Sequence, residues 1–339
     1  MRIRNRRWLL AERPLGRPIL HSDFRWDEGD VDAAALEEGE VLVRVLHLSV
    51  DPAQKGWMEN VADYVAPTAL GEVMRAYGIG QVVVSRAAGM GVGDMVLGYL
   101  GWQDYAVQPA AELERIDGDG PLLAHLGILG LTGYTAFFGL NRIAKPFPGD
   151  TVVITGAAGA VGLVAGQLAK LAGCHVVGIA GGEDKCRWLV EEIGFDAAVD
   201  YRAGPIRKQI RPLVPNGIDV LWDNVGGPTF DNLLPLIATH ARVVVCGAIA
   251  IYSESSLPPG PSHYMNLVFR RARMEGLIVF DYKEEFPWAY KRLAKWLAEG
   301  RLKAPEDVVH GLDQAPAALL RLFEGRNRGK QILSLDAQN

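Results

Sequence analysis

Residues 151–162, TVVITGAAGAVG, decide how this chain folds. The first five are mostly β-branched and apolar, which predicts a buried strand, and residues 160–171 continue with helical periodicity and no proline. Between the two elements, Ala157, Gly159 and Gly162 occupy the small-residue positions of the dinucleotide fingerprint, with alanine replacing the first glycine. Such a turn lets backbone N–H groups at the helix N-terminus hold a pyrophosphate. Tight strand-to-helix turns also favour glycine for structural reasons alone, so the flanking sequence has to decide.

The flanking sequence supports a nucleotide-binding sheet, because five further apolar runs alternate with helical stretches. Six such runs predict an α/β fold with a doubly wound parallel sheet, whose ligand crevice lies at the carboxyl ends of the strands. The fingerprint ends the first of these strands, as that crevice requires. The five further runs are residues 175–180, 197–201, 218–225, 242–247 and 274–279.

The residues after the second predicted strand favour NADPH over NADH. An NAD site usually has an acid about 20 residues beyond the glycines. Here the strand is followed by Gly181 and Gly182, and Lys185 comes soon after, with Tyr201 ending the third strand. An ammonium group and a phenol suit a 2′-phosphate. The alternative is that Lys185 is an ordinary solvated residue of a helix's first turn.

Length, charge and hydropathy predict a two-lobed protein that binds neither nucleic acid nor a membrane. No early apolar run approaches the ~18 residues of a membrane span. A chain of 339 residues exceeds what one core usually supports, and 49% of its residues are hydrophobic. The net charge is −5, and the longest basic blocks are the pairs Arg6-Arg7 and Arg270-Arg271. The basic N-terminus has too short an apolar part for a targeting peptide and reads as a first strand.

Cysteine and histidine spacing predicts neither disulfides nor a metal site. Cys174, Cys186 and Cys246 have no CxxC or framework spacing, which suits a reducing cytoplasm. The seven histidines are scattered without ligand spacing.

The chain divides by pattern into three parts. Residues 1–122 show short alternating runs, such as 41–48, between Gly, Pro and Asp turns, which predicts a β-rich lobe. Residues 123–304 hold the predicted parallel sheet. Residues 305–339 are expected to return to the first lobe.

Eight motifs, spread from residue 48 to residue 333, carry a family resemblance. The chain resembles the medium-chain dehydrogenase/reductase superfamily, and within it the zinc-independent NADPH-dependent alkenal or one double-bond reductases, a group with prostaglandin (leukotriene B4 dehydrogenase type) and curcumin reductases. The resemblance implies a Rossmann domain beside a GroES-like substrate lobe. The motifs are LSVDP (48–52), GYLGWQDYAV (98–107), LGLTGYTAFFGL (129–140), TGAAGAVG (155–162), GGEDKCRWL (181–189), DNVGG (223–227), CGAIAIY (246–252) and GRNRGKQIL (325–333).

The reaction that the resemblance implies is metal-free reduction of the C=C bond of an α,β-unsaturated aldehyde or ketone, by hydride transfer from NADPH to the β-carbon. Tyr252 matches the family's active-site tyrosine. A phenol, with a pKa of about 10, stays protonated and can donate a hydrogen bond to the developing enolate. Tyr252 could instead be an aromatic wall of the nicotinamide pocket. Two other functions stay open, an NADPH quinone oxidoreductase of the same superfamily and a non-catalytic NADPH-binding protein.

The resemblance also assigns site residues. Asn327 would join the two lobes through the cofactor, although a turn asparagine is an equal reading. The family's aromatic and Met-Arg after Asp-Pro are replaced by Ala53, Gln54 and Lys55, which implies a reshaped pocket for an apolar enal or enone. A homodimer is expected through the edge strand near 274–279. The cofactor-binding candidates are Gly159, Ala160, Val161, Gly162, Lys185, Tyr201, Asn224, Cys246, Gly247, Ala248, Ile249, Tyr252, Leu277, Ile278, Val279 and Asn327, and the substrate-pocket candidates are Asp51, Trp57 and Tyr64.

Overall fold

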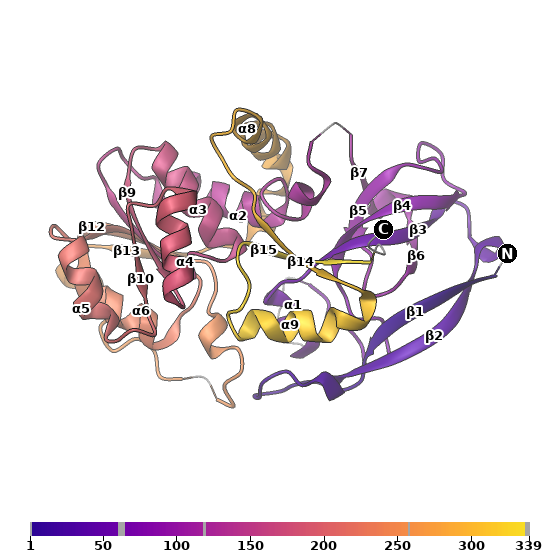
Figure 1. Cartoon of the computed structure of the whole chain (residues 1–339), viewed down its shortest axis with the longest axis horizontal. Helices are drawn as coiled ribbons and strands as arrows, with labels where there is room; N and C mark the ends of the chain where they lie inside the picture. The colour runs from indigo at the N-terminus through magenta and orange to yellow at the C-terminus, as the bar shows by residue number, and fades with distance from the viewer. Residues whose placement is uncertain (1, 60–64, 118–119, 257, 336–339) are drawn as a thin grey trace. The chain divides into compact units, whose positions relative to one another are not determined.

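The computed structural model describes residues 2–59, 65–117, 120–256 and 258–335. The chain forms two compact units, whose elements are labelled in Figure 1. The first unit comprises Met1–Leu126, Glu306–Arg326 and Gln331–Asn339, and the second comprises Gly127–Pro305 and Asn327–Lys330. The short segment Asn327–Lys330 therefore belongs to the second unit, although the stretches on both sides of it belong to the first. Among the described residues, no helix is long and apolar enough to cross a membrane.

The second unit is built on a six-stranded parallel sheet, which confirms the predicted α/β doubly wound fold. Its strand order is β10-β9-β8-β11-β12-β13. The chain runs outward from β8 in one direction and then outward from β11 in the other, so the topological switch point lies between β8 and β11. The strands are β8 (Thr151–Thr155), β9 (His175–Ala180), β10 (Ala197–Asp200), β11 (Ile218–Asp223), β12 (Ile237–Val245) and β13 (Arg273–Gly276).

Apolar side chains of this sheet are buried on both faces, as expected where helices cover a parallel sheet. Val153, Val177, Leu221 and Val243 are buried in one core cluster. Their neighbours along the strands, which point to the other face, are also buried: Val152, Val176, Val220 and Val244. The strands therefore read as continuous apolar runs rather than as alternating ones. The helices of the unit are α2 (Leu131–Phe138), α3 (Ala160–Leu171), α4 (Glu183–Trp188), α5 (Ile206–Ile210), α6 (Gly227–Leu233), α7 (Asn266–Phe269) and α8 (Phe286–Ala298).

The last strand of the sheet is shorter than the predicted run 274–279. Its pairing with β12 ends at Val245 and Gly276, so Leu277 and Ile278 lie beyond the strand and Val279 begins a 3₁₀ turn. The prediction that these three residues form a strand was wrong. Pairing length depends on the neighbouring strand, which local sequence does not specify. β13 is at the edge of the described sheet, as predicted.

The first unit is rich in β-structure, as the alternating pattern predicted. β1 and β2 form a two-stranded antiparallel sheet, and the other strands form a second sheet of order β14-β15-β3-β4-β5-β7, with β6 also paired to β3. The elements are β1 (Arg2–Leu10), β2 (Phe24–Asp32), β3 (Glu40–Ser49), α1 (Ala53–Glu59), β4 (Tyr77–Ser85), β5 (Met95–Tyr99), β6 (Tyr105–Pro109), β7 (Glu114–Arg115), β14 (Glu306–His310), α9 (Ala315–Phe323) and β15 (Lys330–Ser334).

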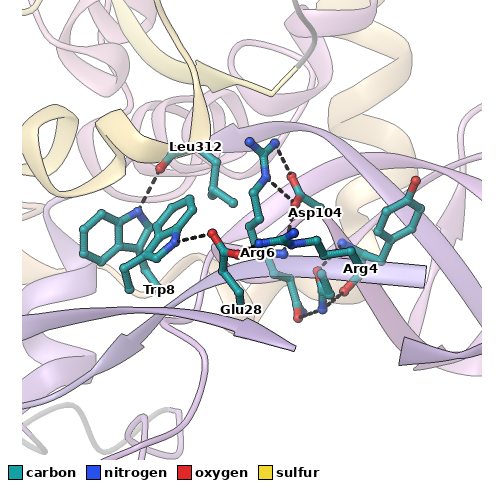
Figure 2. A network of polar contacts seen from close by, with 10 residues as sticks. Arg4, Arg6, Trp8, Glu28, Asp104 and Leu312 are labelled. Atoms are coloured by element: carbon teal, nitrogen blue, oxygen red, sulfur yellow. Dashed lines mark hydrogen bonds and ion pairs between the residues drawn. The ribbon is translucent and has the colours of Figure 1, made fainter. Parts of the chain in front are cut away.

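Polar contacts fix β1 to distant parts of the first unit (Figure 2). The buried indole of Trp8 donates a 2.9 Å hydrogen bond to the carbonyl of Leu312, 304 residues later. The guanidinium of Arg6 donates two bonds, of 2.8 and 3.0 Å, to the carboxylate of Asp104. The returning C-terminal segment is therefore held by the first strand of the chain.

Candidate functional site

The turn between β8 and α3, residues 156–159, consists of glycine and alanine, so no large side chain covers its backbone. A Cβ atom added at Gly162 would lie 2.5 Å from the carbonyl oxygen of Gly156, so only glycine lets α3 begin this close to the turn. Gly159 is the residue before α3, and an added Cβ there would meet only that same carbonyl oxygen. The first N–H groups of a twelve-residue helix therefore emerge beside an unobstructed turn. This geometry fits the diphosphate of a dinucleotide.

A buried hydrogen-bond network joins the carboxyl ends of β8 and β11 at the switch point. The hydroxyl of Thr155 donates a 2.6 Å bond to the carboxyl group of Asp223, which is 2% exposed. The backbone N–H of Gly226 donates to the same carboxyl group at 2.9 Å. The side chain of Asn224 donates a 2.7 Å hydrogen bond to the carbonyl of Thr155 and accepts one of 3.1 Å from the indole of Trp222. The Asn224 amide is thereby held in one orientation at the crevice.

The loop after β12 packs against the end of β11. The backbone N–H groups of Cys246 and Gly247 both donate to the carbonyl of Asp223, at 2.8 and 3.2 Å. The phenol oxygen of Tyr252 accepts a 3.2 Å bond from the N–H of Ala248. The candidates in residues 246–252 therefore lie beside Asn224, as a crevice at the carboxyl ends of parallel strands requires.

The candidates for the adenosine end come from two neighbouring strands. Tyr201 follows β10, and its ring and hydroxyl would lie 2.8 and 2.9 Å from a Cβ atom added at Gly181, which follows β9. The guanidinium of Arg202 lies 5.5 Å from the centre of the Tyr201 ring. Glycine at 181 thus lets the phenol approach the backbone. Lys185 stands in α4, which begins directly after this turn at Glu183.

The segment Asn327–Lys330 pairs with the fingerprint turn within the second unit. The N–H of Gly329 donates 2.8 Å to the carbonyl of Ala158, and Gly329 forms a β-bridge with Gly159. The side chain of Asn327 is buried and donates a 3.1 Å bond to the carbonyl of Gly329. The amide of Asn327 therefore stabilises its own turn, and the turn lies against the residues that fit a diphosphate.

The three candidates after β13, residues 277–279, differ in how far they are exposed. Leu277 is buried, with its side chain against Gly139, whereas Ile278 is 39% exposed and Val279 starts the following 3₁₀ turn. These residues follow the end of a parallel strand, as Asn224 and the candidates in residues 246–252 also do.

The substrate-pocket candidates belong to the first unit. The carboxylate of Asp51 accepts a hydrogen bond from the hydroxyl of Ser49, two residues earlier. Trp57 is buried on α1, and its indole N–H has no hydrogen-bond partner among the described residues. Its ring packs edge to face on Tyr99 at 6.0 Å. Tyr64 lies outside the described residues.

The residues that depart from the family pattern, Gln54 and Lys55, are structural. Both side chains are fully buried. Gln54 donates 2.9 Å to the carbonyl of Arg75. The ammonium of Lys55 donates a 3.0 Å hydrogen bond to the carbonyl of Pro14 and a 2.7 Å bond to the carboxylate of Glu59. The sequence predicts a reshaped pocket at this substitution, and it gives no sign that the two side chains anchor α1.

The three cysteines carry free thiols. Burial raises the pKa of Cys174 to about 11 and that of Cys246 to about 12, so both thiols stay protonated at neutral pH. Within the described ranges, no three His, Cys, Asp or Glu side chains lie together as a metal ion would require.

Two residues that sequence reasoning did not single out hold the site together, Thr155 and Asp223. They are 68 residues apart. Each begins a motif that carries the family resemblance, TGAAGAVG (155–162) and DNVGG (223–227), but neither was assigned a role. One signal was available, since Thr155 ends one predicted strand and Asp223 lies near the end of another, 218–225. The ends of adjacent parallel strands meet at one edge of the sheet.

Comparison with known proteins identifies the family. A family model described as "N-terminal domain of oxidoreductase" matches residues 6–116, and one described as "Zinc-binding dehydrogenase" matches residues 160–295. The chain belongs to the medium-chain dehydrogenase/reductase superfamily, in its zinc-independent group of NADPH-dependent reductases.

Similar proteins define the group. The chain is 40% identical to the NADPH-dependent curcumin reductase of Escherichia coli, over 97% of this chain and 96% of that protein. It is 37% identical to the NADP-dependent 2-alkenal reductase of Nicotiana tabacum, over 88% of each chain. The structure of CurA from Vibrio vulnificus in complex with NADPH matches with a TM-score of 0.91 and 39% identity, over 98% of this chain and all of that one. The protein is therefore an NADPH-dependent oxidoreductase, and the cofactor prediction is confirmed.

Proposed function

We propose that this enzyme reduces the C=C bond of α,β-unsaturated aldehydes and ketones. The names of its relatives, which include a 2-alkenal reductase and a curcumin reductase, support this reaction class. Bound NADPH supplies the hydride, which adds to the β-carbon of the substrate while electrons move to the carbonyl oxygen. The remaining proton is taken up at the α-carbon.

We assign the stabilisation of the carbonyl oxygen to Tyr252. The observation that carries this assignment is the 3.2 Å bond from the N–H of Ala248 to the phenol oxygen. Because that oxygen accepts a hydrogen bond from a backbone N–H group, its own O–H bond is polarised and becomes a better donor. A preorganised donor of this kind stabilises negative charge that develops on an oxygen. The same O–H group, or solvent, delivers the proton to the α-carbon.

We propose that the turn between β8 and α3, together with the residues around it, holds the cofactor. Gly159 and Gly162 lie at the diphosphate, with Ala160 and Val161 between them at the start of α3. Lys185 and Tyr201 bind the 2′-phosphate. The nicotinamide half lies along the candidates that follow β11, β12 and β13, which are Asn224, residues 246–252 and residues 277–279, and along Asn327. Asp51 and Trp57 of the first unit contribute to the substrate pocket, whose preferred substrate is apolar.

A Tyr252→Phe variant tests the reaction and the role of the phenol. We expect kcat/KM for an alkenal to fall by about 10²–10³-fold, the effect of removing one oxyanion donor. The affinity for NADPH, measured by fluorescence titration, is expected to change much less than kcat/KM, because the substituted residue keeps its aromatic ring. Tyr105→Phe, on β6 of the other unit, is the control and keeps full activity.

The substrates in that assay separate the competing functions. Turnover of quinones but not of alkenals would replace the proposal with a quinone oxidoreductase. If the protein bound NADPH but no electrophile oxidised it, the protein would be a non-catalytic NADPH-binding protein. Full alkenal activity in Tyr252→Phe would exclude the phenol as the donor.

We also propose that the enzyme is a homodimer through β13. This strand is at the edge of the described sheet, and all four of its residues are exposed. Large apolar side chains are exposed on and near it, among them Met274 at 40%, Val268 at 63% and Phe269 at 65%. A second copy related by a two-fold axis would cover the edge and these side chains together.

A further inference from the structure

Arg328 lies over an aromatic ring beside the adenosine end of the site. Its guanidinium carbon is 5.5 Å from the centre of the Trp188 ring. Trp188 is buried and is the last residue of α4. Lys185 stands three residues before Trp188 in this helix, a spacing that puts two side chains on one helical face. The cation of Arg328 and that of Lys185 therefore belong to the same side of α4.

The backbone holds Arg328 between this helix and the fingerprint turn. Gly329, the next residue, donates its N–H to Ala158 and forms a β-bridge with Gly159. Arg328 is thus anchored at the turn that fits the diphosphate, while its side chain reaches α4. In a dinucleotide, the ribose that carries the 2′-phosphate lies between these two places.

The acidic groups nearby are already engaged. Glu183 and Asp184, in the first turn of α4, lie 2.8 and 3.6 Å from the guanidinium of Arg187. Asp200 accepts the backbone N–H groups of Gly182 and Arg202, both at 2.9 Å. These contacts direct the carboxylates to other partners, so an incoming phosphate meets less repulsion from them.

We propose that Arg328 is a second cationic residue for the 2′-phosphate of NADPH, and that it strengthens the preference for NADPH over NADH. A guanidinium that rests on an aromatic face is held in place, and its N–H donors point outward in its own plane. Its charge-assisted bonds to phosphate are stronger than neutral ones. The inference rests on the proposed role of Lys185 and on the established cofactor, and is independent of the substrate.

The test compares nucleotide binding by the wild-type enzyme and Arg328→Gln. Fluorescence titration is expected to show that the variant binds NADPH about tenfold more weakly or worse, the effect of losing a hydrogen bond to a charged group. Binding of NADH is expected to stay the same. Calorimetry with adenosine 2′,5′-bisphosphate and with ADP should show the same contrast without any nicotinamide. Arg328→Lys, which keeps the charge, should retain part of the preference.

The control is Arg301→Gln, because the guanidinium of Arg301 also lies over a tryptophan, Trp296, at 6.0 Å. This variant should bind both nucleotides as the wild type does. Since Arg328 is exposed, Arg328→Gln should also melt at the wild-type temperature. An unchanged ratio of NADPH to NADH affinity in Arg328→Gln would overturn the proposal. Equal weakening of both nucleotides would overturn it too, because the contact would then be to the diphosphate. These binding results stand whether or not the enzyme reduces alkenals.

Discussion

The hydroxyl of Thr155 donates a 2.6 Å hydrogen bond to the carboxyl group of Asp223. The two residues end β8 and β11, the strands between which the sheet reverses its winding. The bond joins the carboxyl ends of the two strands, where the side chain of Asn224 is also held by the carbonyl of Thr155. The position of the proposed nicotinamide site therefore depends on a buried ionisable group.

Asp223 is expected to make stability depend on pH. Burial raises its pKa, although bonds from Thr155 and from the N–H groups of Val225 and Gly226 act in the opposite direction. A carboxyl group with a raised folded-state pKa stabilises the fold fully below its unfolded pKa of about 3.9, and this contribution is lost as pH rises through the folded pKa. The stability of the wild type relative to Asp223→Asn should therefore fall as pH rises from about 4 to 7, as measured by urea unfolding.

Asp196→Asn is the control for this experiment. Burial acts to raise the pKa of Asp196, but bonds from Lys170 and from the N–H of Val176 lower it overall. Its contribution to stability is complete above a pH of about 4 and is lost only at lower pH. The stability gap between wild type and Asp196→Asn should thus stay level over the same range. Parallel curves for the wild type and Asp223→Asn would contradict the prediction.

Lys55 is expected to be essential to the stability of the first unit. Its ammonium is fully buried and bonds to two carbonyls and to Glu59, whose side chain is 9% exposed. Lys55→Met leaves that carboxylate uncompensated, which should cost about 3–5 kcal/mol in the free energy of unfolding. The double variant Lys55→Met/Glu59→Leu should recover much of the loss.

Lys295→Met is the matched comparison, because Lys295 pairs with Glu299 at the same i,i+4 spacing but is 64% exposed. An exposed pair of this kind contributes less than about 1 kcal/mol. If both lysine variants lost the same stability, burial would not be the cause.

The proposed dimer gives a prediction for Met274. Met274→Glu places like charges close together where two copies of β13 meet, so light scattering after size exclusion should show a monomer, and the wild type a dimer. Val92→Glu changes an equally apolar side chain that is 69% exposed in the first unit, and should leave the dimer intact. A monomeric wild type at micromolar concentration would refute the edge-strand interface.

Local sequence predicted the elements whose signals are local. β8, which ends at Thr155, and α3, which begins at Ala160, both have the predicted limits. A β-branched run, a glycine turn and a helical period follow one another directly there. The limits of β13 could not be predicted in this way, since they follow from its pairing with β12. For the same reason Lys55, read from sequence as a pocket substitution, could not be recognised as a buried anchor, because its partners include carbonyls about 40 residues away.

The β-bridge between Gly159 and Gly329 limits how the nucleotide-binding unit can be separated from the rest of the chain. A gene fragment that stops at Pro305 encodes every strand of the parallel sheet, yet it lacks the peptide that closes over the glycine-rich turn. Grafting the nucleotide module onto another protein therefore requires two separate pieces of coding sequence, and a nonsense mutation in the last few codons before Gly329 would damage a turn encoded 170 codons earlier.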